Sequence, residues 1–134
     1  MSTTLHATPK ADATARAFLD ALVDRDFAAL GGLLADDVWF RILLPRQTME
    51  AHTTTETVAA YHEWYGTAAA FEVLYLDHHT MAGREFVAYR FGLRPSWAPE
   101  QWHVIEQSGY VRVRDGRVSR LDLVCTGFHP VDPG

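Results

Sequence analysis

The stretch from Tyr110 to Cys125, YVRVRDGRVSRLDLVC, constrains the fold more than any other part of the sequence. Apolar and polar residues alternate on both sides of an Asp-Gly pair, which predicts two β-strands joined by a tight turn. A two-residue loop pairs Val113 with Val118 and leaves apolar and charged residues mixed on both faces. A three-residue loop that ends at Gly116 pairs Val113 with Arg117 and separates the two kinds of residue, so we favour this register.

With the three-residue loop, one face of the hairpin is mostly apolar and the other is half charged. The apolar face, which we expect to point inward, carries Ile105, Gln107, Gly109, Val111, Val113, Ser119, Leu121, Leu123 and Cys125. The outer face carries Val104, Glu106, Ser108, Tyr110, Arg112, Val118, Arg120, Asp122 and Val124. Apolar groups and charges of both signs share this outer face.

The first half of the chain is predicted to be mainly helical. Apolar residues recur at helical spacing within residues 12–35, and Asp24-Arg25-Asp26 divides this stretch into two helices. Thr53 and Glu56 have the spacing of a capping box, which predicts the start of a third helix that ends at Gly66.

Strands occupy most of the remaining chain. Besides the hairpin, we expect strands at VWFRILL before Pro45, at residues 71–80 and at residues 85–93. We expect connections without regular structure at 47–53, 82–83 and 94–101 and in the tail 128–134. Helices first and antiparallel strands afterwards predict an α+β protein whose N-terminal helices pack on one face of a curved, mostly antiparallel sheet.

Composition and charge exclude several classes of protein. The chain has 134 residues, 48% of them apolar, which predicts one domain over residues 1–134 with its core at about 11–127 and flexible ends. A net charge of −5 with no basic run speaks against binding of nucleic acid or membranes. A single cysteine, no apolar run long enough for a membrane span and no signal peptide at the N-terminus predict a cytoplasmic protein.

The order of these elements, together with ARAFLDALVDRDFAALGGLLADDVWF and GYVRVRDGRVSRLDL, resembles the nuclear transport factor 2-like superfamily in its SnoaL-like branch. The resemblance covers about residues 11–127, and the end of the chain is similar to actinobacterial members. It implies a cone-shaped, cystatin-like α+β barrel with a pocket between helices and sheet. The superfamily includes isomerases, polyketide cyclases, dehydratases, epoxide hydrolases and binding proteins without catalysis, so the resemblance does not select an activity.

The catalytic positions of these relatives do not carry over. The three positions of the ketosteroid-isomerase set match Phe18, Ile42 and Gly109, which have no acid or base. The epoxide-hydrolase set needs an Arg-x-Asp, which is absent from the matching strand, and its last position matches Thr126. His103 and Asp122 have the chemistry of the SnoaL-type pair but not its register.

Three neighbouring residues of the first hairpin strand are candidates for site chemistry. Histidine is the usual residue for acid–base chemistry near neutral pH, so His103 is the best candidate for a general acid or base, with a strand-end histidine that caps the strand or is solvated as the alternative. Gln107 is expected to orient a ligand oxygen, or to belong to a structural hydrogen-bond network. Glu106 supplies a carboxylate to the pocket only if the strand bulges and turns this residue inward.

Other residues are expected to line the pocket, each with an ordinary structural role as the alternative. They are Tyr89, Trp39, Arg41, Tyr61, Trp64, Leu121, Leu123 and Cys125. For the aromatic residues the alternative is the core, for Arg41 it is a salt bridge, and for Cys125 it is the role of a small buried apolar residue.

Neither a metal nor a cofactor is expected. In Asp77-His78-His79 the two histidines point to opposite faces of a strand and do not easily bind one ion. No glycine-rich phosphate loop follows a strand.

Two functions remain open. The chain is predicted to bind a small apolar or polyketide-like molecule, either as a cofactor-free cyclase, isomerase or dehydratase with acid–base chemistry, or as a binding or dimerisation module without catalysis. The resemblance implies a homodimer formed through the outer face of the sheet.

Overall fold

The computed structural model describes residues 9–81 and 83–131, so the ends and Ala82, part of one predicted turn, lie outside it. Helix α1 spans Pro9–Val23 and α2 spans Phe27–Leu33. They meet at Arg25, which has a left-handed backbone with φ of 51°. The Asp26 side chain then caps α2 by accepting a hydrogen bond from the Ala29 N–H at 3.0 Å. The predicted division at Asp24-Arg25-Asp26 is confirmed.

The capping box predicts the third helix correctly. Helix α3 spans Thr54–Tyr61, and the Glu56 N–H donates to the Thr53 hydroxyl at 3.1 Å. The Glu56 carboxylate accepts from the N–H of His52, one residue before the cap. A single π-helical turn, η2 (His62–Gly66), continues α3 and ends at the predicted glycine. No helix of the described residues has the length and apolar character needed to cross a membrane.

Seven strands form one curved, mixed sheet that does not close over the described residues. The strands are β1 (Leu34–Leu44), β2 (Gln47–Ala51), β3 (Ala70–Met81), β4 (Arg84–Arg94), β5 (His103–Arg114), β6 (Arg117–Cys125) and β7 (His129–Pro130). Their order is β2-β1-β6-β5-β4-β3, and β7 pairs with the start of β5. Only β1 and β6 run parallel; the other pairs are antiparallel. The α+β class with helices on a curved sheet is confirmed.

Two predicted loops contain short strands instead. Residues 47–53 were expected to be a loop, but β2 pairs with β1, with Ile42 opposite Met49. Most of β2 is exposed and polar, so this edge strand has no apolar alternation that sequence reasoning detects. The C-terminal tail likewise contributes β7 before the undescribed residues 132–134.

The expected three-residue turn of the β5–β6 hairpin is wrong. Arg114 pairs with Arg117, and the two-residue turn has left-handed φ values of 54° at Asp115 and 76° at Gly116. A bulge at Ser119 then shifts the register, so that Val111 lies opposite Leu121. The bulge restores the expected sorting of faces beyond this point, but it also turns Val118 inward, where it is buried.

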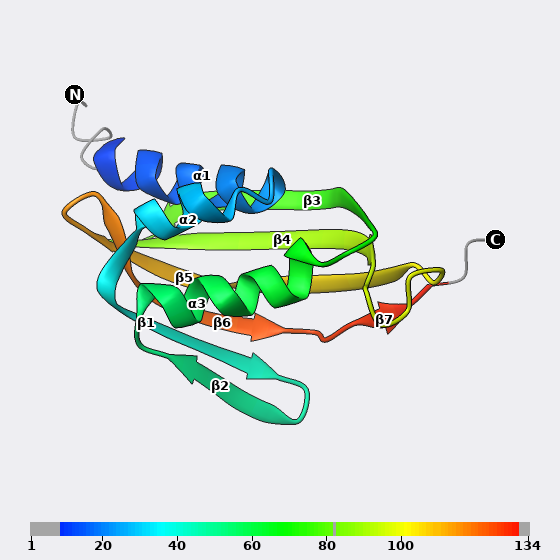
Figure 1. The fold of residues 1–134 in the computed structure, drawn as a ribbon. Coiled ribbons are helices and arrows are strands. Elements are labelled where there is room, and N and C mark those ends of the chain that lie inside the picture. Colours follow the sequence, from blue (N-terminus) through cyan, green and yellow to red (C-terminus); the bar gives the residue numbers. More distant parts are fainter. Residues whose placement is uncertain (1–8, 82, 132–134) are drawn as a thin grey trace.

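All three helices lie over one face of the sheet, and the other face is uncovered (Figure 1). The core fills the space between them. Its largest fully buried side chains are Phe18, Leu19, Leu22, Leu30, Leu34, Phe40, Ile42, Tyr61, Tyr65, Tyr89, Phe91 and Leu93. The sheet continues beyond the end of α3 toward β7, where the connection from β4 to β5 lies against it.

Candidate functional site

A chain of buried polar groups crosses the core from α3 to β6. The Tyr61 and Tyr89 hydroxyl oxygens lie 3.0 Å apart, and the Tyr89 hydroxyl lies 2.6 Å from Oε1 of Gln107. The Gln107 amide nitrogen then lies 3.4 Å from Sγ of Cys125. All four residues are at most 5% exposed. Neighbouring elements thus each supply one polar group to the inner face.

The hydrogen bonds of this chain run in one direction. The Tyr89 hydroxyl donates to Gln107, and a hydroxyl has only one proton to give. Tyr61 must therefore donate to Tyr89, while the Gln107 amide donates to Cys125. The Tyr61 oxygen keeps free lone pairs, so this end of the chain still has the capacity to accept a hydrogen bond.

Tyr65 adds a hydroxyl without a partner beside this chain. It lies in the π-helical turn η2, is 1% exposed, and its ring centroid is 6.1 Å from that of Tyr61. Its hydroxyl oxygen is buried and makes no hydrogen bond to any described residue. Buried hydroxyls normally have a partner, so this atom is the strongest single indication of a binding position in the core.

Burial raises the pKa of Tyr61, Tyr65 and Tyr89 above the usual tyrosine value, because the phenolate would lose its water. The three hydroxyls therefore stay protonated at neutral pH. They are suited to hold and polarise a ligand oxygen, and they do not act as bases.

Aromatic rings surround these hydroxyls. Phe91 packs edge-on against Tyr65 at 5.1 Å and is stacked on Tyr89 at 5.2 Å. The half-buried Trp64 lies edge-on to Tyr61 at 5.6 Å between ring centroids. An apolar ligand with one or two oxygens matches this combination of rings and hydroxyls.

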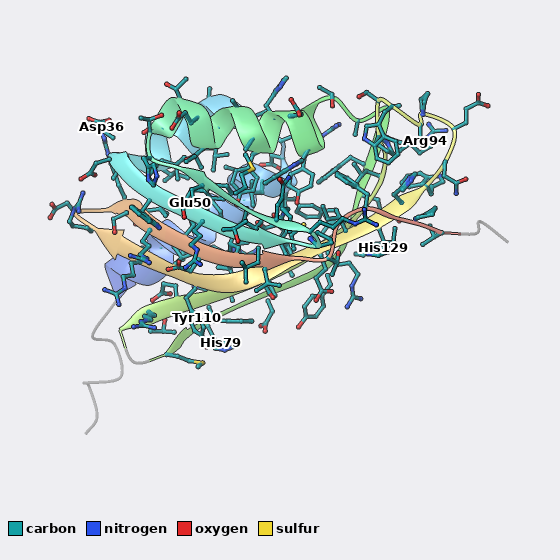
Figure 2. All side chains as sticks on the ribbon, turned by 90° about the horizontal axis from the view of Figure 1, so that it is seen from below. Asp36, Glu50, His79, Arg94, Tyr110 and His129 are labelled. Carbon is teal, nitrogen blue, oxygen red and sulfur yellow. The ribbon has the colours of Figure 1, made fainter. Side chains whose placement is uncertain are left out.

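His103 lies on the same inner face but at the far end of β5. It is 4% exposed, and Trp97 and Phe128 pack edge-on against its ring at 4.9 and 6.5 Å. Its Nδ1 lies 3.0 Å from the carbonyl oxygen of Gln101. A carbonyl only accepts, so Nδ1 carries the proton, and Nε2 of the neutral ring is left to accept one. Figure 2 places the nearby Arg94 and His129 at this end of the molecule.

The structure places three of the predicted site residues on the outer face. The register of β4 with β5 is regular from Glu85–Val111 to Leu93–His103, so no bulge turns Glu106 inward. Glu106 instead pairs with Arg90 at 2.8 Å. Trp39 packs on His52 with ring centroids 4.4 Å apart, and Arg41 is exposed. These three do not join the buried chain.

The remaining predicted residues are on the inner side. Leu121, Leu123 and Cys125 are at most 5% exposed, as the sorting of faces predicts. Gly109 also has a specific reason to lack a side chain, since its φ is 155° and a Cβ would overlap the carbonyl oxygen of Asp122. The position that the resemblance assigns to an acidic side chain is therefore closed to one here.

Sequence reasoning missed two groups on the inner face. Tyr65 was expected only as part of the third helix. Its position four residues after Tyr61 indicates that both side chains lie on the same face of that helix, which would have identified it. Glu85 is 2% exposed, and its carboxylate accepts hydrogen bonds from His78 at 2.9 Å and Thr80 at 3.0 Å. His79 points to the other face and stacks on Phe86, so the two histidines diverge as expected.

The main surface hollows lie elsewhere. One of about 570 Å³ lies over α3, beside Phe27, Val58 and His62. Others of about 400 and 170 Å³ open on the outer face of the sheet. A fourth, of about 440 Å³, lies beside the β5–β6 turn. In the part of the chain described, none of these four is lined by His103, Tyr89 or Gln107.

Solved structures of other proteins share this fold. A candidate polyketide cyclase from Xanthomonas campestris matches with a TM-score of 0.71 and 16% identity, over 87% of this chain and 90% of that one. An NTF2-like protein from Burkholderia xenovorans matches with a TM-score of 0.66 and 14% identity, over 88% and 90% of the two chains. The chain has the NTF2-like fold.

A further structure with the NTF2-like fold is a candidate ketosteroid isomerase from Kribbella flavida, with a TM-score of 0.61 and 23% identity over 95% of this chain and 85% of that one. No protein-family model and no curated protein sequence matches this chain. The SnoaL-like, NTF2-like fold expected from the resemblance is thus confirmed at the level of structure.

Proposed function

We propose that this NTF2-like chain binds a small, mostly apolar molecule with a carbonyl or hydroxyl oxygen, between α3–η2 and the inner face of the sheet. The observation that carries the proposal is the buried Tyr65 hydroxyl without a partner. Leaving such a group unpaired costs about 1–3 kcal/mol, which a ligand oxygen recovers. The free lone pairs of Tyr61 offer a second contact to a ligand hydroxyl.

The tyrosine pKa values support binding rather than proton abstraction at this position. Tyr61, Tyr65 and Tyr89 remain neutral donors, and the other members of the chain, Gln107 and Cys125, add no carboxylate or imidazole. The role of the cluster is to orient the ligand and to withdraw charge from its oxygen.

Acid–base catalysis is the second candidate, and the hydrogen bond from His103 to the Gln101 carbonyl favours it. This bond leaves Nε2 free to take a proton from a carbon next to the ligand carbonyl and to return it to another carbon, which is an isomerisation without a cofactor. Gln107 follows His103 by four positions on β5, which is about 13 Å along the strand. The ligand must therefore be as long as a fused-ring polyketide or a steroid. Two of the similar structures carry the names of a candidate polyketide cyclase and a candidate ketosteroid isomerase, and these names support the same ligand class.

Binding and catalysis are separated by two substitutions and two assays. Binding is measured by the fluorescence of 2-naphthol, a small phenol, and turnover by the isomerisation of a β,γ-unsaturated 3-ketosteroid. We expect Tyr65→Phe to weaken 2-naphthol binding about tenfold, which is about 1.4 kcal/mol. The control Tyr75→Phe changes an exposed tyrosine of β3 and leaves binding unchanged. Equal affinity of Tyr65→Phe and the unchanged protein rejects the binding site.

The catalytic candidate depends on His103→Gln. We expect this variant to bind 2-naphthol within about twofold of the unchanged protein, because His103 lies far from the hydroxyls, and to lose turnover. Ligand binding without turnover in the unchanged protein leaves the binding module as the function.

We also infer that a second copy covers part of the outer face of the sheet. Leu43 and Val124 are paired neighbours on β1 and β6, and they are 45% and 55% exposed. Together with Arg41 and Asp122 they border the hollow of about 170 Å³, which combines apolar surface with charges of both signs. Analytical ultracentrifugation of Val124→Glu tests this contact, with monomers as the expected result; a monomeric unchanged protein would contradict it.

A further inference from the structure

Three arginines stand in a row across the outer face of the central strands. Arg112 of β5 lies directly opposite Arg120 of β6. Glu85 lies opposite Val111, so the preceding residue on β4, Arg84, continues the row on the other side of Arg112. The three side chains line one hollow of about 400 Å³, together with Tyr110 and Asp122. We call Arg84, Arg112 and Arg120 the arginine row.

The row lies on the side of the sheet that the helices leave open. Figure 2 shows Tyr110 and His79 on the side that faces away from α3. Phe86 packs edge-on against Tyr110 at 5.7 Å and stacks on His79, which forms an aromatic border beside the row. All three arginines lie on central strands of the sheet. Arg120 is paired on both sides, with Trp39 of β1 and Arg112 of β5, and Arg84 is paired with Met81 of β3.

Positive charge in the row is only partly neutralised. Arg120 binds Asp122 at 2.6 Å and lies over the Trp39 ring at 5.5 Å. Within residues 9–81 and 83–131, Arg84 and Arg112 have no carboxylate partner. The hollow thus combines three guanidinium groups with one carboxylate, in a chain whose net charge is −5. The local excess of positive charge is opposite in sign to the rest of the molecule.

Like charges directly opposite each other on paired strands destabilise a sheet. An ordinary surface position tolerates a neutral or acidic residue at least as well, so three aligned arginines indicate a bound anion that compensates the repulsion. The planar guanidinium group matches the oxygens of a phosphoryl group with two parallel hydrogen bonds, and the Tyr110 hydroxyl is one more donor.

We propose that the arginine row binds the phosphoryl group of a compact anion with at least two negative charges, such as a phosphate monoester or a diphosphate. This site is separate from the apolar ligand position, because it lies on the opposite face of the sheet. Extended polyanions fit less well: Asp77 and the Arg90–Glu106 pair follow the row on the same face, so the positive surface is short.

Calorimetric titration with sodium pyrophosphate tests the site, with sodium chloride at matched ionic strength as the blank. We expect saturable binding to one site per chain and a rise in melting temperature that chloride does not give. Arg112→Gln and Arg84→Gln should each weaken pyrophosphate binding at least tenfold. The matched control is Arg16→Gln on α1, an exposed arginine on the helix side, and it should keep the affinity of the unchanged protein.

Melting temperature without the anion gives a second readout. At low ionic strength Arg112→Gln should melt at the same temperature as the unchanged protein or higher, because the substitution removes repulsion. A lower melting temperature together with unchanged pyrophosphate affinity overturns the proposal and assigns Arg112 a structural role. Equal affinity in Arg112→Gln and Arg16→Gln overturns it as well.

Two further arms identify the source of the phosphoryl group. Arg112-dependent binding of pyrophosphate but not of vesicles that contain phosphatidic acid supports a soluble ligand. Arg112-dependent capture by these vesicles supports the same phosphoryl chemistry on a lipid headgroup. If Arg112→Gln changes the oligomeric state but not pyrophosphate binding, the row belongs to a subunit contact and the proposal is wrong.

Discussion

On the inner face of β5, Gln107 is fully buried, and both polar atoms of its side chain have partners in Tyr89 and Cys125. One residue away on the outer face, Glu106 pairs with Arg90 in partial contact with water. The polar groups of the inner face are mostly neutral and paired; Tyr65 is neutral but unpaired, and Glu85 is a carboxylate held by hydrogen bonds from His78 and Thr80. The outer face accepts charges of either sign, even in a row. Water, rather than strand position, makes the difference, since burial of a charge costs far more than burial of a paired amide.

The largest effect expected from the exclusion of water from the inner face is a loss of stability at alkaline pH. The folded protein holds Tyr61, Tyr65 and Tyr89 neutral because burial raises each pKa, whereas the unfolded chain ionises them near about pH 10. Below that pH these groups are neutral in both states and contribute no pH dependence. Above it only the unfolded state loses the protons, so the free energy of unfolding falls by about 1.4 kcal/mol per pH unit for each tyrosine. We expect a loss of about 4 kcal/mol by about pH 11, measured by urea unfolding.

Tyr65→Phe sharpens this prediction. Its hydroxyl is buried without a partner, so its removal should raise the free energy of unfolding at neutral pH by about 1–3 kcal/mol, while the alkaline loss shrinks by the share of one tyrosine. An alkaline loss identical to that of the unchanged protein would show that Tyr65 does not contribute to it.

A matched pair of leucines compares packing on the two faces. Leu121 is fully buried, and Leu43 on the neighbouring β1 is 45% exposed. We expect Leu121→Ala to lower the free energy of unfolding by about 3 kcal/mol through lost burial and a residual cavity. Leu43→Ala should change the stability of the monomer by less than about 0.5 kcal/mol. Chemical denaturation below the concentration of any self-association measures both; similar losses would mean that Leu43 is buried in solution.

A comparison of two glycines distinguishes the cost of a left-handed backbone from the cost of steric overlap with a neighbouring strand. Gly109 and Gly83 both have positive φ, at 155° and 81°, but only Gly109 would bring a Cβ against the backbone of the next strand. We expect Gly109→Ala to cost about 2 kcal/mol or more and Gly83→Ala about 1 kcal/mol. Thermal unfolding of the two variants measures both losses of stability. Equal losses would mean that β5 and β6 separate easily at Gly109.

Loss of an outer ion pair should have only a small effect. Glu106→Gln removes the partner of Arg90 in a position that is about one-third exposed, and we expect a loss below about 1 kcal/mol that disappears at about 1 M salt. Urea unfolding at low and high salt measures it. A loss of turnover in this variant, with stability preserved, would instead place Glu106 in the reaction.

Sequence patterns predicted the features that depend on burial alone. Alternation along β5 placed Gln107 inward, and helical spacing with the Thr53–Glu56 capping box located α3. They failed where a single residue changes geometry without changing hydrophobicity: the left-handed Asp115 that allows a two-residue turn, and the bulge at Ser119.

The site was less accessible from sequence than the fold. Glu106 and Gln107 differ by one position, and only the regular β4–β5 register decides which of them points inward. The unpaired Tyr65 hydroxyl and the arginine row depend on distances between elements. Arg112 and Arg120 become neighbours only after the bulge is known, so no spacing in the sequence identifies them.

The parallel pairing of β1 with β6 has a consequence for how the chain folds. Phe40 lies beside Leu121 in the folded sheet, so β1 pairs with β6, a strand that is synthesised after β2, β3, β4 and β5. Before β6 is made, β1 is paired only with β2 on one edge. The backbone N–H and C=O groups on the opposite edge of β1 are then available to pair with other chains. Contacts between distant parts of a chain also slow folding, so the closing step should be slow and concentration-sensitive during synthesis. Truncation before β6 would therefore leave an aggregation-prone sheet edge rather than a smaller folded protein.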